Sequence, residues 1–102
     1  MSEQLIKTIE QHLKLAPKIG YTILIDLQDG GEIYIDGRDQ PPKVSGNDEN
    51  FSEPDTTLRC DTALFEGIVN GTKDPNMAAL TGKLKIEGSM GVALKLASLL
   101  ED

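Results

Sequence analysis

One cysteine, Cys60, and one histidine, His12, are the side chains best suited to covalent catalysis in this sequence of 102 residues. A catalytic cysteine needs a base beside it, and that base needs a third group to orient it. Cys60 falls in an expected strand and His12 in an expected helix far away in the chain, with no third residue to place between them. Two such residues cannot complete a zinc site either, and one cysteine forms no internal disulfide. We therefore expect no catalytic residue, no metal and no cofactor, with Cys60 a small buried hydrophobe.

Two groups of carboxylates are the remaining candidates for chemistry, as ligands of a cation. One group surrounds an expected hairpin and the other follows it; they comprise Asp26, Asp36 and Asp39, then Asp48, Glu49, Glu53 and Asp55. Neither has the spacing of a calcium loop, which needs a central glycine and a closing glutamate. We interpret both groups as solvated acidic surface.

The overall charge argues against some classes of binding partner. The formal net charge is −7, and residues 21–61 hold ten acidic against three basic side chains. Nucleic acid binding needs a clustered excess of lysine and arginine, and so does binding to an anionic membrane through a broad face. We therefore expect no nucleic acid partner.

Length and composition indicate one folded unit. A chain with 38% hydrophobic and 26% charged residues is typical of a single globular domain, here over residues 1–102. The opening residues MSEQLIKTIE lack the apolar run of a secretory signal. No apolar run approaches the roughly 18 residues that span a bilayer. We expect a cytoplasmic protein.

Apolar periodicity predicts strands in the first part of the chain and helices in the second. Residues 2–16 repeat apolar side chains every three or four positions, which predicts an amphipathic helix ended by Pro17. Alternation then predicts strands over Tyr21–Gln28, Glu32–Asp36, 43–45 and 56–60.

Beyond the strands the period changes to about 3.6 residues. Asp61 and Gly71 are typical start and stop residues of a helix. The remaining elements are a short helix from Asp74-Pro75 to near Gly82, a strand over Lys83–Glu87 and a helix from Ser89 to Leu100. A strand meander over residues 20–60, followed by helices and one more strand, indicates an α+β fold. We expect a mostly antiparallel five-stranded sheet covered by helices.

The last expected helix is apolar over more of its surface than its position explains. Only Gly91, Lys95 and Ser98 form a polar strip, so apolar side chains cover an arc of roughly 220°. A surface helix needs an apolar stripe of about 100°. Something is therefore expected to cover the surplus apolar face. The alternatives are the core of the domain itself, a second subunit or a bound apolar molecule.

The residues around the start of this helix carry a family resemblance. Residues 82–96 read GKLKIEGSMGVALKL, which resembles the carboxy-terminal signature of the sterol-carrier-protein type 2 lipid-binding family. Upstream, the helix after Asp61 and the segment DPNMAAL at residues 74–80 resemble the helix, loop and short helix of the same family.

The resemblance implies an apolar tunnel between the sheet and the C-terminal helix. Its ligands would be fatty acids, acyl-CoA, sterols or other lipids, bound or transferred without catalysis. The surplus apolar face of the last helix would line this tunnel. The residues that we expect to line it are Leu64, Phe65, Ile68, Met77, Leu80, Leu84, Ile86, Met90, Ala93, Leu94 and Ala97.

A second interpretation makes the same apolar face a protein interface. It would join two copies of the chain in a homodimer, or pack on a partner such as an enzyme. The helix over residues 2–16, with Lys7 and Lys14 beside its apolar side, could also touch a membrane during lipid exchange.

Overall fold

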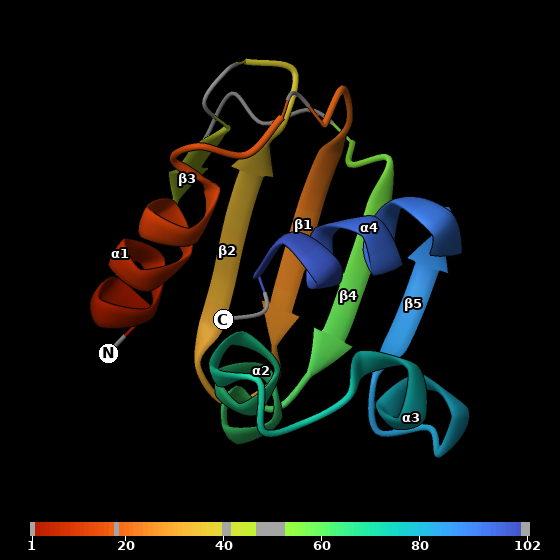
Figure 1. The fold of residues 1–102 in the computed structure, drawn as a ribbon. Coiled ribbons are helices and arrows are strands. Elements are labelled where there is room, and N and C mark those ends of the chain that lie inside the picture. The colour runs from red at the N-terminus through yellow and green to blue at the C-terminus, as the bar shows by residue number, and fades with distance from the viewer. Residues whose placement is uncertain (1, 18, 40–41, 47–52, 101–102) are drawn as a thin grey trace.

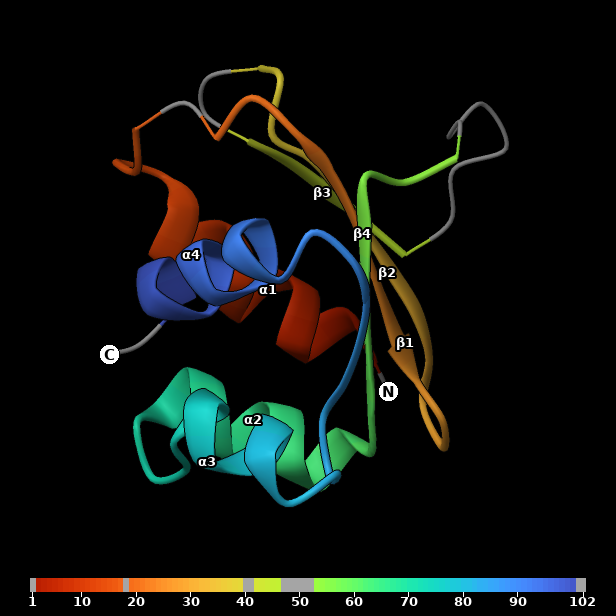
Figure 2. The same ribbon diagram turned by 90° about the vertical axis from the view of Figure 1, so that its right-hand side faces the viewer.

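The computed structural model describes residues 2–17, 19–39, 42–46 and 53–100 and arranges them in two layers (Figure 1). The four helices of the described chain lie on one side of a five-stranded sheet, as the side view shows (Figure 2). The elements in chain order are α1 (Ser2–Leu13), β1 (Thr22–Leu27), β2 (Gly31–Asp36), β3 (Lys43–Ser45), β4 (Thr56–Cys60), α2 (Thr62–Asn70), α3 (Pro75–Leu80), β5 (Lys85–Gly88) and α4 (Met90–Leu100).

The sheet is mixed, with the strand order β3-β2-β1-β4-β5. β2 runs antiparallel to β1 and β3, and β5 runs antiparallel to β4, whereas β1 and β4 are parallel. The expected α+β class and the mostly antiparallel sheet of five strands are confirmed. The expected meander over residues 20–60 is wrong for its last strand. The meander ends with β3, and β4 lies on the other side of β1.

Hydrogen bonds at both ends of β1 explain its parallel neighbour. At its start, the Thr22 N–H donates to Oδ2 of Asp55 (2.8 Å), and the Asp55 N–H donates to the Thr22 carbonyl oxygen (2.9 Å). At its end, the Gln28 N–H donates to the Cys60 carbonyl oxygen (3.0 Å). The chain therefore enters and leaves β4 beside the same ends of β1. Side-chain alternation indicates the face of a strand but not its neighbour, so the sequence pattern carries no sign of this pairing.

The inner face of the sheet and the helices enclose an aliphatic core. Its strand residues alternate, so that Ile23 and Ile25 of β1 face the helices together with Ile33 and Ile35 of β2, all four fully buried. Each such side chain contributes about 1.5–3 kcal/mol when fully buried. The largest fully buried side chains are Phe65, Ile9, Leu13, Ile23, Ile25, Leu27, Ile33, Ile35, Leu58, Ile68, Leu96 and Leu100.

The first helix is shorter than the pattern predicts. It ends at Leu13 instead of residue 16, and the chain then turns, with the Ala16 N–H donating to the Leu13 carbonyl oxygen (3.1 Å). Pro17 explains the difference, because the ring of a proline disfavours helical geometry in the residue before it.

The last strand begins two residues later than predicted, at Lys85. The N–H groups of Lys83 and Leu84 both donate to the carbonyl oxygen of Ala78, at 2.9 and 3.0 Å. These two residues therefore complete the end of α3 and are not yet paired with β4.

The expected caps of α2 and α3 are confirmed. Asp61 accepts from the N–H of Leu64 (2.7 Å), and Gly71 ends α2 with φ 80°. Asp74 accepts from the N–H of Asn76 (2.9 Å) at the start of α3. Within the described ranges, none of the helices combines the length and the apolar character needed to cross a membrane.

Candidate functional site

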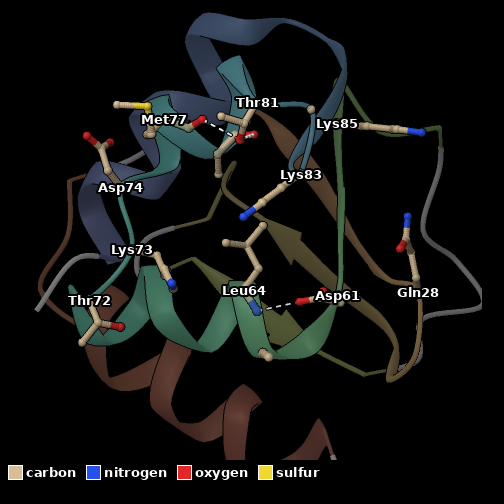
Figure 3. A pocket seen from close by; sticks show the side chains of 13 residues that line it. Gln28, Asp61, Leu64, Thr72, Lys73, Asp74, Met77, Thr81, Lys83 and Lys85 are labelled. Carbon is tan, nitrogen blue, oxygen red and sulfur yellow. Dashed lines mark hydrogen bonds between the residues drawn. The ribbon is translucent and has the colours of Figure 1, made fainter.

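A pocket of about 770 Å³ opens at the end of the sheet where β1 and β4 finish and β5 begins (Figure 3). Small-molecule sites typically measure about 300–1,000 Å³. Its walls come from the residue after β1, the start of α2, the loop between α2 and α3, and α3 with the turn that follows it. The lining residues are Gln28, Asp61, Ala63, Leu64, Thr72, Lys73, Asp74, Met77, Ala78, Thr81, Gly82, Lys83 and Lys85.

The floor of the pocket is the outer surface of the core. Ala78 is only 5% exposed and belongs to the core, and the half-buried Leu64 packs against it. Both residues also line the pocket. The side chain of Met77, which is 58% exposed, adds a flexible apolar wall. Apolar side chains thus face the pocket on one side and the interior of the protein on the other.

The rim of the pocket is charged. Lys73, Lys83 and Lys85 line it together with Asp61 and Asp74. Both carboxylates are held at helix starts, where they accept main-chain N–H groups. Among the residues that the structure describes, none of the three lysines lies within ion-pair distance of a carboxylate.

Two glycines shape the wall that carries these lysines. Gly82 has φ 79°, a left-handed conformation that glycine adopts without strain, and it reverses the chain so that Lys83 follows directly. Gly67 lies beneath Lys73, where a Cβ would come within 2.4 Å of the Lys73 Cγ. The N–H groups of Thr72 and Lys73 donate to the Gly67 carbonyl oxygen (2.9 and 3.1 Å). The loop therefore folds back on α2 and holds the stem of Lys73 there.

The inner face of α4 packs into the core and does not line this pocket. Ala93, Leu96 and Leu100 have no exposed surface. An internal void large enough for water would expose the side chains around it, so these three border no such void. The tunnel between α4 and the sheet stays a prediction, and a lipid could occupy that space only after α4 moves.

The residues expected to line the tunnel separate into three groups by exposure. The buried ones are Phe65, Ile68, Leu84, Ala93 and Ala97. The half-buried ones are Leu64, Ile86 and Leu94. The exposed ones are Met77, Leu80 and Met90. Two of the set, Leu64 and Met77, line the pocket, and the contact of each residue with a ligand stays a prediction.

The sequence pattern did not predict the lysines of the pocket, Lys73, Lys83 and Lys85. Alternation places Lys83 on the outer side of a strand, whereas it lies in the turn before β5. Lys73 lies in a loop between two helices, where no periodicity applies. One sequence signal could have found two of them. A glycine at the end of a helix comes shortly before each, Gly71 before Lys73 and Gly82 before Lys83, and such glycines mark a reversal of the chain.

Cys60 and His12 belong to different elements, β4 and α1. Cys60 ends β4, and burial, with the nearby carboxylate of Asp61, raises the pKa of its thiol to about 12. A thiol that stays protonated at neutral pH is a poor nucleophile. The His12 ring contacts the carbonyl oxygen of Leu100.

Two of the carboxylates that were weighed as cation ligands, Asp26 and Asp36, pair with arginines. Asp26 lies 3.1 Å from Nε of Arg59, and Asp36 lies 3.0 Å from Nε of Arg38. The hydrogen bond from Arg38 holds the pKa of Asp36 below its usual value. Residues 48–49 of the second group lie outside the described residues. In the part of the chain that is described, no group of three or more His, Cys, Asp or Glu side chains is placed to hold a metal ion.

Comparison with known sequences gives one family. The family model described as the SCP-2 sterol transfer family matches residues 3–101. Hydroxysteroid dehydrogenase-like protein 2 of Xenopus tropicalis is 32% identical over 80 residues, which are 78% of this chain and 19% of that protein. The chain therefore spans about one fifth of the length of this relative.

Solved structures share the fold. The sterol carrier protein domain 2 of Helicoverpa armigera superposes with a TM-score of 0.78 at 24% identity, over 97% of this chain and 84% of that one. Palmitated SCP2L2 from Aedes aegypti superposes with a TM-score of 0.66 at 20% identity, over 95% of both chains. Since the family model covers nearly the whole sequence and the fold agrees, the chain belongs to the SCP-2 sterol transfer family.

Proposed function

We propose that this protein binds a long-chain lipid reversibly and without catalysis, and that the lipid enters through the pocket between α2, α3 and the start of β5. The observation that carries the proposal is the position of Leu64 and Ala78, which line the pocket and also pack in the core. A chain that enters the pocket meets apolar side chains first and the aliphatic interior behind them. Membership of the SCP-2 sterol transfer family supports the same class of ligand.

Removal of the lipid from water supplies the free energy of binding. A chain that buries about 300 Å² gains roughly 7 kcal/mol at about 25 cal/mol per Å². Part of this gain offsets the entropy that the lipid and the protein lose on association. No covalent step is needed, so the lipid leaves in the form in which it arrived.

Uptake of a whole lipid chain requires space that Ala93, Leu96 and Leu100 of α4, which have no exposed surface, do not leave beside them. The smallest side chains on the inner face of α4 are Ala93 and Ala97, both buried. When α4 moves away from the sheet, more space for a lipid opens beside these two alanines than beside the larger side chains of the helix. The first residue of α4, Met90, is already 55% exposed. We propose that α3 and the start of α4 move outward when the lipid enters, which opens the tunnel between α4 and the sheet.

Two neighbouring positions on α3, Met77 and Asn76, provide the test. Met77→Glu places a carboxylate in the pocket wall, and Asn76→Glu places the same group on the same helix at an exposed position outside the pocket. Titration with a fluorescent long-chain fatty acid should show binding to the wild type, a loss of about tenfold or more in M77E and little change in N76E. Circular dichroism checks that both variants fold.

Absence of binding to the wild type would overturn the proposed function. Equal weakening in both variants would overturn the entry route through the pocket. Native mass spectrometry of protein purified without detergent gives an independent check, because a lipid that copurifies adds its own mass.

A further inference from the structure

We propose that the pocket selects lipids with an anionic headgroup, a carboxylate or a phosphate, and that Lys73 and Lys83 hold this group at the pocket mouth. The proposal rests on the lipid binding proposed above and adds the class of lipid. The apolar chain would then run from the two lysines over Leu64 toward the core. Neutral lipids of the same length would bind more weakly.

The distribution of positive charge on the protein carries this proposal. The chain has a formal net charge of −7, yet three lysines gather around one pocket. Both arginines pair with carboxylates, through the bonds of Arg38 to Asp36 and of Arg59 to Asp26, whereas within the described ranges no lysine has such a partner. The three pocket lysines differ from the other lysines in lying together beside an apolar floor. Unpaired ammonium groups beside an apolar floor match a ligand that has one anionic end and one apolar end.

The carboxylates on the rim bond to the main chain and, among the residues that are described, form no ion pair with the lysines. Asp61 and Asp74 each direct an oxygen to a main-chain N–H at the start of a helix, at 2.7 and 2.9 Å. The positive end of each helix backbone stabilises this arrangement. The three lysines outnumber these two carboxylates around the pocket, so the rim keeps an excess of one positive charge.

The two lysines named here are held by the fold on facing walls of the pocket. Lys83 reaches from the turn after α3 across the opening toward Leu64, while Lys85 points away from it (Figure 3). The main chain at Lys83 is fixed by its hydrogen bond to Ala78. The stem of Lys73 rests on Gly67 of α2. The main-chain bond at Lys83 and the contact of the Lys73 stem with Gly67 thus set which part of the pocket mouth each ammonium group can reach.

Three ligands with the same sixteen-carbon chain separate headgroup recognition from binding of the chain. Hexadecanol is neutral, palmitate carries a carboxylate and hexadecyl phosphate carries a phosphate. Dissociation constants would be measured for the wild type, for Lys73→Gln/Lys83→Gln, and for Lys14→Gln/Lys95→Gln, which removes the same charge from exposed positions outside the pocket. Circular dichroism again checks folding.

We expect the wild type to bind at least one of the two anions about tenfold more tightly than hexadecanol, the size of a charge-assisted hydrogen bond. The pocket variant should lose this preference and keep its affinity for hexadecanol, and the control variant should keep both. The anion with the larger preference identifies the headgroup. Added salt should weaken the preference.

The outcomes separate the two proposals. Equal affinity for the alcohol and both anions, or a preference that survives in the pocket variant, would overturn headgroup selection and leave lipid binding intact. Failure of all three ligands to bind would overturn lipid binding itself, and headgroup selection with it.

Discussion

The imidazole Nδ1 of His12 donates a hydrogen bond to the main-chain carbonyl oxygen of Leu100, at 2.5 Å. A carbonyl oxygen only accepts, so this nitrogen carries a proton. The bond joins the end of α1 to the end of α4, where the last carbonyl groups of a helix have no partner within it. α4 is therefore held at its C-terminal end, and we expect the proposed outward movement of the helix to begin at its exposed first residue, Met90.

Replacement of His12 by alanine removes this bond. We expect the free energy of unfolding to fall by about 1–2 kcal/mol, because the Leu100 carbonyl then lacks its partner in a partly buried place. Urea denaturation measures the change. Gln11→Ala, at an exposed position beside it, is the control and should change stability by less than about 0.5 kcal/mol. Equal stability of H12A and the wild type would show that the bond does not secure α4.

Asp29 ties the turn after β1 to the start of α2. Its Oδ1 accepts from the hydroxyl (2.7 Å) and from the N–H (2.8 Å) of Thr62, and these bonds hold the pKa of Asp29 below its usual value. The folded chain thus favours the ionised form more than the unfolded chain does. The resulting stability is complete above the usual pKa and is lost as the pH falls through the lowered one.

We therefore expect Asp29→Asn to destabilise the protein at neutral pH and to lose less stability on acidification than the wild type. Urea midpoints at neutral pH and at a pH below the lowered pKa give the comparison. Glu10→Gln, on an exposed side of α1, should lose as much stability as the wild type does. An equal loss in D29N would contradict the role of the Thr62 bonds.

Gly88 joins β5 to the start of β4 without room for a side chain. Its φ is 90°, and a Cβ would lie 2.4 Å from the Asp55 carbonyl oxygen. We expect Gly88→Ala to cost about 3 kcal/mol or more, from steric overlap added to backbone strain. Gly82→Ala is the matched control, with φ 79° and nothing within 4 Å of the new Cβ, and should cost about 1 kcal/mol. Equal costs in urea denaturation would show that the overlap is relieved.

The buried Cys60 thiol should not react in the folded protein. Burial and the neighbouring carboxylates raise its pKa to about 12, so both access and the reactive thiolate are lacking at neutral pH. We expect a thiol-specific reagent to label the wild type only on unfolding. Ser98→Cys, at an exposed position on α4, should label at once. Rapid labelling of native Cys60 would show that the end of β4 opens readily.

Ala97 tests the space between α4 and the sheet. Ala97→Leu overfills a site that is 2% exposed and should cost about 1–3 kcal/mol of stability. We also expect weaker binding of the fluorescent fatty acid, because the added side chain would fill part of the space proposed for the lipid. Ser98→Leu, the exposed neighbour, should change neither quantity. Unchanged affinity in a folded A97L would place the lipid elsewhere.

Local chemistry explains which parts of the fold were predictable. Asp61, Gly71 and Asp74 mark helix ends through bonds to residues within one turn, so their types and spacing were enough. The strands β1 and β2 were predicted to within one residue at each end, because a two-residue period and a glycine turn are also local signals. Residues 82–96 carried the family resemblance, which the family match then confirmed.

The features that the sequence did not predict depend on contacts between distant segments of the chain. The parallel neighbour of β1 depends on Thr22 and Asp55, which are separated by two strands in the sequence. The pocket combines four segments, and its lysines belong to a loop and a turn whose positions follow from Gly67 and Gly82. The sequence placed Leu64 and Met77 in the expected tunnel lining, and both line this pocket. Apolar periodicity carries no information on the charged residues around the pocket.

The short outer strands affect how copies of this protein meet one another. β3 has three residues and β5 has four, against six in β1 and in β2, so each border of the sheet offers few open main-chain donors and acceptors. Each border also carries a lysine, Lys43 or Lys85, and two identical borders would bring like charges together. The sheet is thereby protected against edge-to-edge aggregation.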